Sequence, residues 1–185
     1  GFILMLSRPF AVGDWVRIGE HEGFITEITI NNVRLRNLDG EHVVLPNEAV
    51  NNRTIINRSL EGKLRLRIQV GIDYDTDPSH AENIALDALS ELDDIMNQPE
   101  PQVLPVKFDD SAIILELRFW VDSPTPQKKW RAVRNVIHNV KSAFRHEGIK
   151  IPFPQRELTG RGETGGFHIA QATSKEGDRI RRTES

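Results

Sequence analysis

One stretch, residues 8–47, constrains the fold of this chain more than any other. Its short runs of apolar residues are bounded by Gly, Asn or Asp, which permit tight turns. Asp39-Gly40 separates two of the runs and is the strongest hairpin signal in the sequence. Gly13 and Gly23 stand near strand ends, where a small, bent barrel needs positive φ or close backbone approach. The stretch predicts a compact β domain with strands at residues 15–18, 24–30, 33–38 and 42–45.

A second domain is predicted after a break in the pattern at Glu61-Gly62. Residues 48–59 precede the break and are expected to form a short turn and the last strand of the β domain. Residues 63–72 alternate strictly between apolar and polar side chains, which indicates a half-buried strand with one cationic face. We therefore expect a β domain at residues 10–61 and an α/β domain at residues 62–158.

Two helices are predicted in the second domain, because Asp77-Pro78 and Thr125-Pro126 each combine an N-cap residue with proline at the first helical position. Apolar residues at helical spacing mark one face of the first helix: Ala81, Ile84, Ala85, Ala88, Leu89, Leu92, Ile95 and Met96. The corresponding face of the second helix is predicted from Trp130, Val133, Ile137, Val140 and Phe144. Gly148 fits the position just past its end.

Two more strands are expected between the helices, at residues 103–108 and 113–121. The order is β-α-β-β-α, and residues 149–153 could add the strand that completes a ferredoxin-like α/β sandwich. From residue 159 to residue 185 the composition is polar and aperiodic, which predicts a mostly disordered tail. No run approaches the roughly 18–20 apolar residues that span a bilayer. The apolar residues 1–6 are interpreted either as a buried strand or helix end, or as the end of a transmembrane helix.

Composition argues against several kinds of chemistry. The formal net charge is −3, whereas a dedicated nucleic-acid binder usually carries a basic surplus. The chain has no cysteine, which excludes disulfides and thiolate metal sites. Its six histidines are scattered, and no nucleophile elbow is present. We expect neither an enzyme nor a cofactor.

Asp73, Asp75 and Asp77 have the spacing of the first ligands of a calcium loop. Such a loop needs Gly at its sixth position and a bidentate Glu at its twelfth, and this chain has Pro78 and Ile84 there. The pattern therefore predicts a turn followed by a helix cap, with no metal bound.

Nucleic-acid binding is the main alternative function, because small β-barrels and ferredoxin-like sandwiches both occur in RNA-binding proteins. The arginine pairs Arg34/Arg36 and Arg65/Arg67 are the best support for it. Sheets that recognise RNA also stack bases on exposed aromatic residues, and only Trp120 is expected to face outward beside these strands. The arginine pairs fit a solvated sheet face or an intersubunit surface better, so we expect no nucleic-acid partner.

The stretch at residues 8–47 also resembles the small-conductance mechanosensitive channel family. The resemblance rests on Arg8, Pro9, Phe10, Gly13, Asp14, Val16, Gly23, Asp39, Gly40, Pro46 and Asn47, and it continues to Gln155. It implies an α+β fold class, with a small Sm-like β-barrel domain followed by a ferredoxin-like α/β sandwich domain. It further implies the cytoplasmic vestibule of an inner-membrane channel, formed by a ring of seven identical subunits, that opens under tension and releases ions and solutes.

The resemblance also implies roles for individual residues. Phe2, Ile3, Leu4, Met5 and Leu6 would be the membrane-proximal end of a pore helix. Arg8 would lie at the membrane–water boundary, where a cation can face lipid headgroups. The residues expected to hold the β ring together are Pro9, Phe10, Gly13, Asp14, Gly23, Asp39, Gly40, Pro46 and Asn47. Residues 155–159 would supply the strand of a narrow C-terminal barrel.

Overall fold

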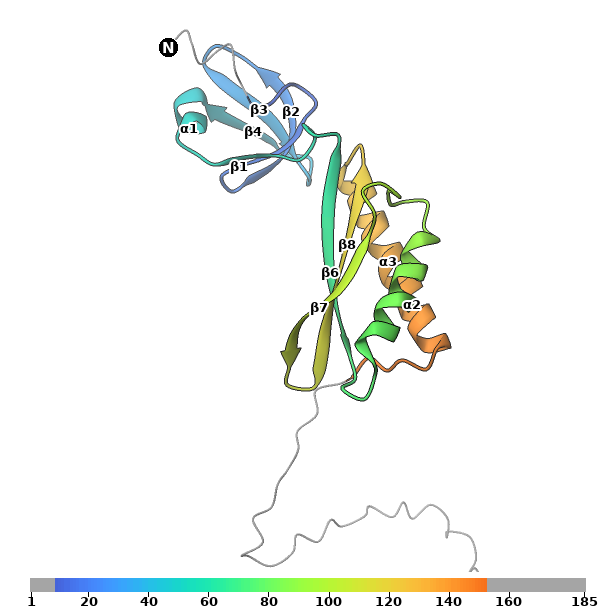
Figure 1. Ribbon diagram of the computed structural model, residues 1–185. Coiled ribbons are helices and arrows are strands. Elements are labelled where there is room, and N and C mark those ends of the chain that lie inside the picture. Colours follow the sequence, from blue (N-terminus) through green and yellow to red (C-terminus); the bar gives the residue numbers. More distant parts are fainter. Residues whose placement is uncertain (1–8, 153–185) are drawn as a thin grey trace, which may run out of the picture. The chain divides into compact units, whose positions relative to one another are not determined.

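The computed structural model describes residues 9–152 (Figure 1). The elements in chain order are β1 (Trp15–Ile18), β2 (His21–Ile28), β3 (Asn32–Asn37), β4 (His42–Pro46), α1 (Asn47–Asn51), β5 (Ile55–Asn57), β6 (Lys63–Ile72), α2 (Pro78–Ser90), β7 (Gln102–Asp109), β8 (Ala112–Asp122) and α3 (Pro126–His146). The expectations for residues 1–8, for the strand at 155–159 and for the tail at 159–185 lie outside the described residues. Within residues 9–152, no helix combines the length and apolar content needed to cross a bilayer.

The strands β1–β5 form one five-stranded antiparallel sheet in the order β4-β3-β2-β1-β5, which we call the β domain together with α1. A change of register between Ile25 and Glu27 interrupts the β2–β3 pairing, and such bulges bend a sheet. The four predicted strands are confirmed to within a few residues. The core of the β domain consists of Phe10, Val16, Ile18, Ile25, Val33, Leu35, Leu45 and Val50.

The segment after β4 differs from the prediction of a short turn, because residues Asn47–Asn51 form the five-residue helix α1. Pro46 ends β4 and occupies the N-cap position. Val50 is buried in the core, with 4% of its surface exposed. Burial of this one apolar side chain stabilises a helix too short to form alone.

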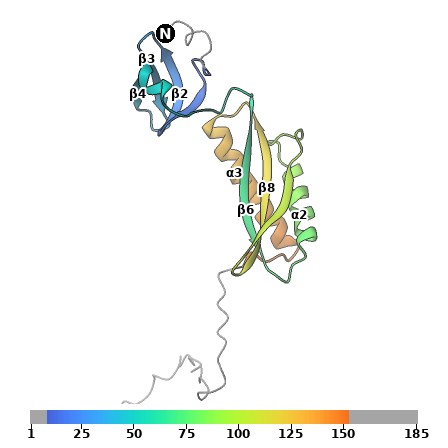
Figure 2. The ribbon, with the colours of Figure 1, turned by 60° about the vertical axis from the view of Figure 1, so that its left-hand side comes forward.

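The remaining elements form the α/β domain, in which a three-stranded antiparallel sheet has the order β6-β8-β7. Both helices lie on one face of this sheet, and α2 and α3 run side by side (Figures 1 and 2). The predicted alternation in β8 is confirmed, since Leu115, Leu117 and Phe119 are each at most 1% exposed. The opposite face carries the polar residues, including Lys63, Arg65 and Arg67, as the alternation in β6 predicts.

The predicted helix starts are confirmed by the capping hydrogen bonds. The side chain of Asp77 accepts from the backbone N–H of Ser79 at 3.2 Å, and Thr125 Oγ1 accepts from that of Lys128 at 3.2 Å. The predicted end of the second helix is also confirmed, since Gly148 follows α3 with φ of +71°. This left-handed conformation favours glycine.

The first helix ends earlier than predicted. α2 stops at Ser90, so Leu92, Ile95 and Met96 follow the helix instead of extending its apolar face. Contacts with other parts of the domain compete with continuation of the helix. The Met96 N–H donates to the Trp120 carbonyl at 2.8 Å, and Ile95 is buried. Leu92 and Ile95 therefore pack against the core from the turns that follow the helix.

The predicted apolar face of α3 is wrong at two positions. Trp130 is 61% exposed and Ile137 is 47% exposed. The helix packs instead along a stripe at four-residue spacing, Ala132, Val136, Val140 and Phe144. Alanine at position 132 allows close packing on this side, so the stripe rotates away from the bulkier side chains.

A fourth strand of the ferredoxin-like sheet does not form in residues 149–152, contrary to one expectation. Only one hydrogen bond joins this segment to the end of β6, from the Asp73 N–H to the Lys150 carbonyl at 3.2 Å. Pro152 has no N–H and cannot extend such a ladder.

Candidate functional site

The chain enters the β domain at Pro9 and leaves it at Leu60, and the side chain of Asn57 joins these two points. Asn57 Nδ2 donates to the Pro9 carbonyl at 3.0 Å and to Asp14 Oδ2 at 2.7 Å. Its Oδ1 accepts from the backbone N–H groups of Ser59 at 2.9 Å and Leu60 at 3.0 Å. We call this arrangement the Asn57 clasp. It connects the incoming and outgoing segments through one side chain.

The residues at the start of the β domain support the clasp. Asp14 Oδ2 also accepts from the Ala11 N–H at 2.9 Å, which closes a tight turn. Gly13 has φ of +94°, in the left-handed region that favours glycine, and its N–H donates to the Ile25 carbonyl at 2.8 Å. Phe10 is 7% exposed and packs in the core. The predicted residues Pro9, Phe10, Gly13 and Asp14 are therefore brought together.

A second set of contacts fixes the outgoing segment to β1 and β2. Trp15 is 1% exposed, and its Nε1 donates to Glu22 Oε1 at 2.9 Å. Arg58 pairs with the same carboxylate at 3.2 Å and lies over the Trp15 ring at 5.3 Å. Ser59 Oγ accepts from the Trp15 N–H at 2.9 Å. The roles of Glu22, Asn57 and Arg58 were not predicted from the sequence, because their partners lie up to 48 residues away and no local motif marks them.

Gly23 lies in β2 opposite Asn37 of β3, where the two backbones approach closely. A Cβ atom at this position would lie 2.2 Å from the Arg36 carbonyl oxygen. No real contact is this short, and backbone atoms cannot rotate away as a flexible side chain can. Glycine is therefore required here for packing.

The other predicted residues shape two loops of the β domain. Asp39 and Gly40 form the β3–β4 turn, where Gly40 has φ of +88° and Asn37 Oδ1 accepts from the Asp39 N–H at 3.1 Å. Pro46 ends β4, and Asn47 Nδ2 donates to the Ile30 carbonyl at 2.7 Å. These residues support the sheet and make no hydrogen bond to the clasp.

The polar face of the α/β sheet carries one aromatic ring, Trp120, which lies beside two cations. Lys63 Nζ is 5.4 Å and the Arg65 guanidinium is 6.0 Å from the ring centroid. A cation near the face of an aromatic ring is attracted by the negative electrostatic potential of that face. In the described residues this face therefore lacks the bare aromatic platform on which RNA bases stack.

Glu116 is the one charged residue buried in the described part of the chain, at 7% exposed. Arg118 Nε donates to its carboxylate at 2.7 Å and Gln69 Nε2 at 3.1 Å. The hydrogen bonds from Arg118 and then Gln69 lower the pKa of Glu116 below its ordinary value, although burial opposes this. Ionised Glu116 therefore accepts one hydrogen bond from Arg118 of its own strand and one from Gln69 of β6.

We expect acidification to remove the contribution of ionised Glu116 to the stability of the folded chain. A carboxyl group whose pKa is lowered on folding stabilises the folded state above its unfolded pKa, and the stabilisation disappears as the pH falls through the folded pKa. Glu116→Gln should therefore unfold at lower urea concentration than the parent chain at pH 7. This difference in midpoint should shrink steadily below about pH 4.5, the ordinary value. If the difference in urea midpoint stays constant down to pH 2.5, ionisation of Glu116 does not contribute to stability.

The three aspartates with calcium-loop spacing take part in local backbone hydrogen bonds. Asp73 Oδ1 accepts from the Asp75 N–H at 3.1 Å, and Asp77 caps α2. Among residues 9–152, no group of three or more His, Cys, Asp or Glu side chains is placed to hold a metal ion.

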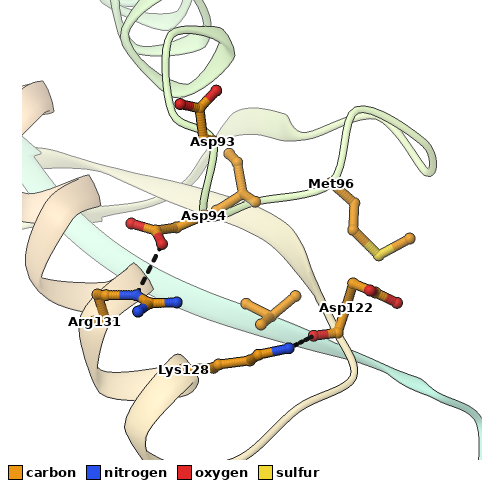
Figure 3. Close-up of a pocket in the computed structure, with 8 residues that line it drawn as sticks. Asp93, Asp94, Met96, Asp122, Lys128 and Arg131 are labelled. Atoms are coloured by element: carbon orange, nitrogen blue, oxygen red, sulfur yellow. Dashed lines mark hydrogen bonds and ion pairs between the residues drawn. The ribbon is translucent and has the colours of Figure 1, made fainter.

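A hollow of about 190 Å³ lies between the start of α3 and the segment after α2 (Figure 3). Figure 3 shows that two of its basic side chains, Arg131 and Lys128, are engaged with neighbouring residues. Arg131 pairs with Asp94 at 2.9 Å, and Lys128 Nζ donates to the Asp122 carbonyl at 3.3 Å. The residues that line this hollow include no Ser, Thr, Cys or His.

Two family models match the chain in succession. The model described as mechanosensitive ion channel, beta-domain matches residues 1–60, and the model described as mechanosensitive ion channel MscS, C-terminal, matches residues 66–151. An MscS family protein of Archaeoglobus fulgidus is 31% identical, with 84% of this chain covered and 54% of the relative. The mechanosensitive channel MscK of Escherichia coli is 30% identical, with 89% of this chain covered and 15% of MscK. The chain thus spans about half, or less, of these relatives.

A solved structure with a similar fold is Helicobacter pylori MscS in its closed state. The TM-score is 0.76 at 24% identity, with 88% of this chain covered and 63% of that chain. This similarity, together with the two sheets described above, confirms the predicted fold class of a small β domain followed by a ferredoxin-like domain. The β-domain model and the C-terminal model match consecutive parts of this chain. This chain belongs to the MscS family of mechanosensitive ion channels, of which it carries the β-domain and the C-terminal domain.

Proposed function

We propose that this chain forms the cytoplasmic vestibule of a channel that opens under membrane tension and releases ions and small solutes during hypo-osmotic shock. The observation that carries the proposal is the match of two consecutive mechanosensitive-channel domains over most of the chain. Seven copies would form a ring beneath the pore, on the cytoplasmic side of the inner membrane. The domain boundary lies at Glu61-Gly62 in this proposal. The chain would pass ions and solutes without catalysing a reaction.

The residues at the start of the β domain have a mechanical role in this proposal. Residues 2–6 would end a pore helix, and Arg8 would lie at the level of the lipid headgroups. A helix that ends before Pro9 is followed at once by Phe10, which is buried in the β domain. In this proposal, movement of the pore helix would pull on the Asn57 clasp, because Asn57 binds the carbonyl of Pro9, the first described residue of the β domain.

The test uses the full-length parent protein in bacteria that lack their own mechanosensitive channels. We expect the parent to increase survival after sudden dilution and to give tension-activated currents in membrane patches. Blotting of the membrane fraction controls for expression. If the parent reaches the membrane but neither protects the cells nor conducts under tension, the proposed function is wrong.

A further inference from the structure

The end of the α/β domain that carries the β7–β8 hairpin exposes apolar side chains. Phe108 of β7 is 78% exposed, more than any other large apolar residue in the described part of the chain. Tyr74 stacks on it with 6.3 Å between the ring centroids, and the Tyr74 hydroxyl donates to the Asp109 carbonyl. Val106 and Ile151 are also exposed. We call Tyr74, Val106, Phe108 and Ile151 the hairpin patch.

The strand that carries Val106 and Phe108 has a free edge. Among the described strands β7 pairs with β8 alone, so the backbone N–H and C=O groups along its other side have no partner strand. An exposed edge with apolar side chains is a template for a further strand, and native proteins usually cover or charge such an edge. The edge and the patch together fit an occupant that supplies an extended backbone and large apolar side chains.

The chain itself contains such a segment after its last described residue. From residue 159 onward, the one cluster of large apolar residues is Phe167 and Ile169. They alternate with His168 and Ala170, which is the pattern of a strand with one apolar face. The last proline of the chain is Pro154, so each residue of this segment has the backbone N–H that a strand ladder requires.

The chain leaves the α/β domain close to the hairpin patch. The Asp73 N–H donates to the Lys150 carbonyl at 3.2 Å, which holds the departing segment beside Tyr74. In both views the tip of the β7–β8 hairpin and the last turn of α3 lie at the same end of the domain (Figures 1 and 2). The residues from Pro152 to Phe167 can extend over about 50 Å, whereas β7 is only about 26 Å long. Because the tether is short, its effective concentration is in the millimolar range, and weak contacts suffice for docking.

We propose that residues 167–171 dock against the free edge of β7 as an additional strand of the same chain. Phe167 and Ile169 would cover Val106 and Phe108, and their backbone would complete the ladder that β7 leaves open. The two matched family models end at residues 60 and 151, so the docking segment lies outside both matched domains. The proposal is independent of the channel function, because it requires only one copy of the chain.

The strand register places the two faces of this contact. Phe108 pairs with the buried Ile113 and shares its face of the sheet, whereas Lys107 pairs with Ile114 and lies on the other face. Since neighbouring residues of a strand point to opposite faces, His168 would lie on the same face as Lys107 when Phe167 and Ile169 cover the patch. These two positions can therefore be changed without removing an apolar contact.

Disulfide trapping tests the docking directly, because the chain has no cysteine of its own. One variant combines Lys107→Cys with His168→Cys, and the matched control combines Arg67→Cys with His168→Cys. Arg67 is also exposed on the sheet but belongs to β6, at the opposite edge. Under mild oxidation, we expect the 107–168 pair to close within one chain at least about tenfold faster than the 67–168 pair. Mass spectrometry of the unreduced chain measures closure.

Substitutions in the docking segment separate specific docking from chance encounter with the sheet. Phe167→Ser with Ile169→Ser should slow closure of the 107–168 pair at least about tenfold, because the apolar contacts are lost. Ile180→Ser is the control, since Ile180 is also apolar but lies between charged residues outside the docking segment, and it should leave closure unchanged. In the chain without added cysteines, Phe167→Ser with Ile169→Ser should also speed amide hydrogen exchange in β7 about tenfold.

Three results would overturn the proposal. The first is equal closure rates for the 107–168 and 67–168 pairs. The second is closure that does not change when Phe167 and Ile169 are replaced by serine. The third is cross-linking between chains in place of closure within one chain, which would assign the hairpin patch to the docking segment of a second copy.

Discussion

Replacing Gly23 with alanine is expected to lower the free energy of unfolding of the β domain by about 3 kcal/mol. The added Cβ would lie 2.2 Å from the Arg36 carbonyl oxygen and 2.8 Å from the Asn37 Cα. Both atoms belong to the backbone of β3, so relief of the clash requires the two strands to separate. The hydrogen bonds between β2 and β3 are lost or lengthened as a result.

Urea denaturation monitored by tryptophan fluorescence measures this effect. Trp120 and Trp130 are first replaced by phenylalanine, so that the buried Trp15 alone reports on the β domain. Gly40→Ala is the control, because Gly40 has a positive φ but an added Cβ there would meet no atom within 4 Å. It should cost only about 1 kcal/mol. Equal midpoints for the two variants would contradict the close-approach explanation. In the full-length parent, we expect Gly23→Val to reach the membrane, as blotting can verify, but to rescue cells poorly from dilution.

Asn57→Ala is expected to have the second largest effect, a loss of about 2–3 kcal/mol, because it removes four hydrogen bonds and leaves Asp14 with fewer donors. The same denaturation assay applies. In the full-length parent we also expect a higher tension threshold in patch recordings, since the substitution separates the incoming segment at Pro9 from the outgoing segment at Leu60.

Asn52→Ala provides the matched control for this prediction. Asn52 also makes a side-chain hydrogen bond, from Nδ2 to the Glu48 carbonyl at 3.1 Å, but it is exposed and joins only neighbouring turns of α1. Its replacement should change the free energy of unfolding by less than about 0.5 kcal/mol. If Asn57→Ala has an equally small effect on stability and an unchanged threshold, the clasp has no mechanical role.

Local chemistry made much of the fold predictable. Asp39-Gly40 identified the β3–β4 hairpin, and Asp77-Pro78 identified the start of α2, because each signal acts within a few residues of itself. The alternation in residues 113–121 predicted the buried face of β8 for the same reason. These features depend on backbone preferences and on burial of one face, and both can be read from neighbouring residues.

The clasp and the helix packing could not be predicted in this way. Asn57 contacts Pro9 across 48 residues, and an asparagine near a strand end has no pattern that indicates its partner. Trp130 satisfies the helical spacing of the core but lies outside it, because the position of α2 determines which side of α3 is buried. Both the clasp and the packing of α3 depend on contacts between residues that are far apart in the sequence.

The pairing of β6 has a consequence for the order in which the chain folds. The β domain can complete its sheet once residue 57 has been synthesised, since β5 is its last strand. β6 must wait for β8, because Lys63 pairs with Asp122 and Ile72 with Ile113. Chains fold from the N-terminus during synthesis, so β6 is exposed as an unpaired strand while α2 and β7 emerge. The lysine and arginines at alternate positions of β6 discourage its pairing with other nascent chains during that interval.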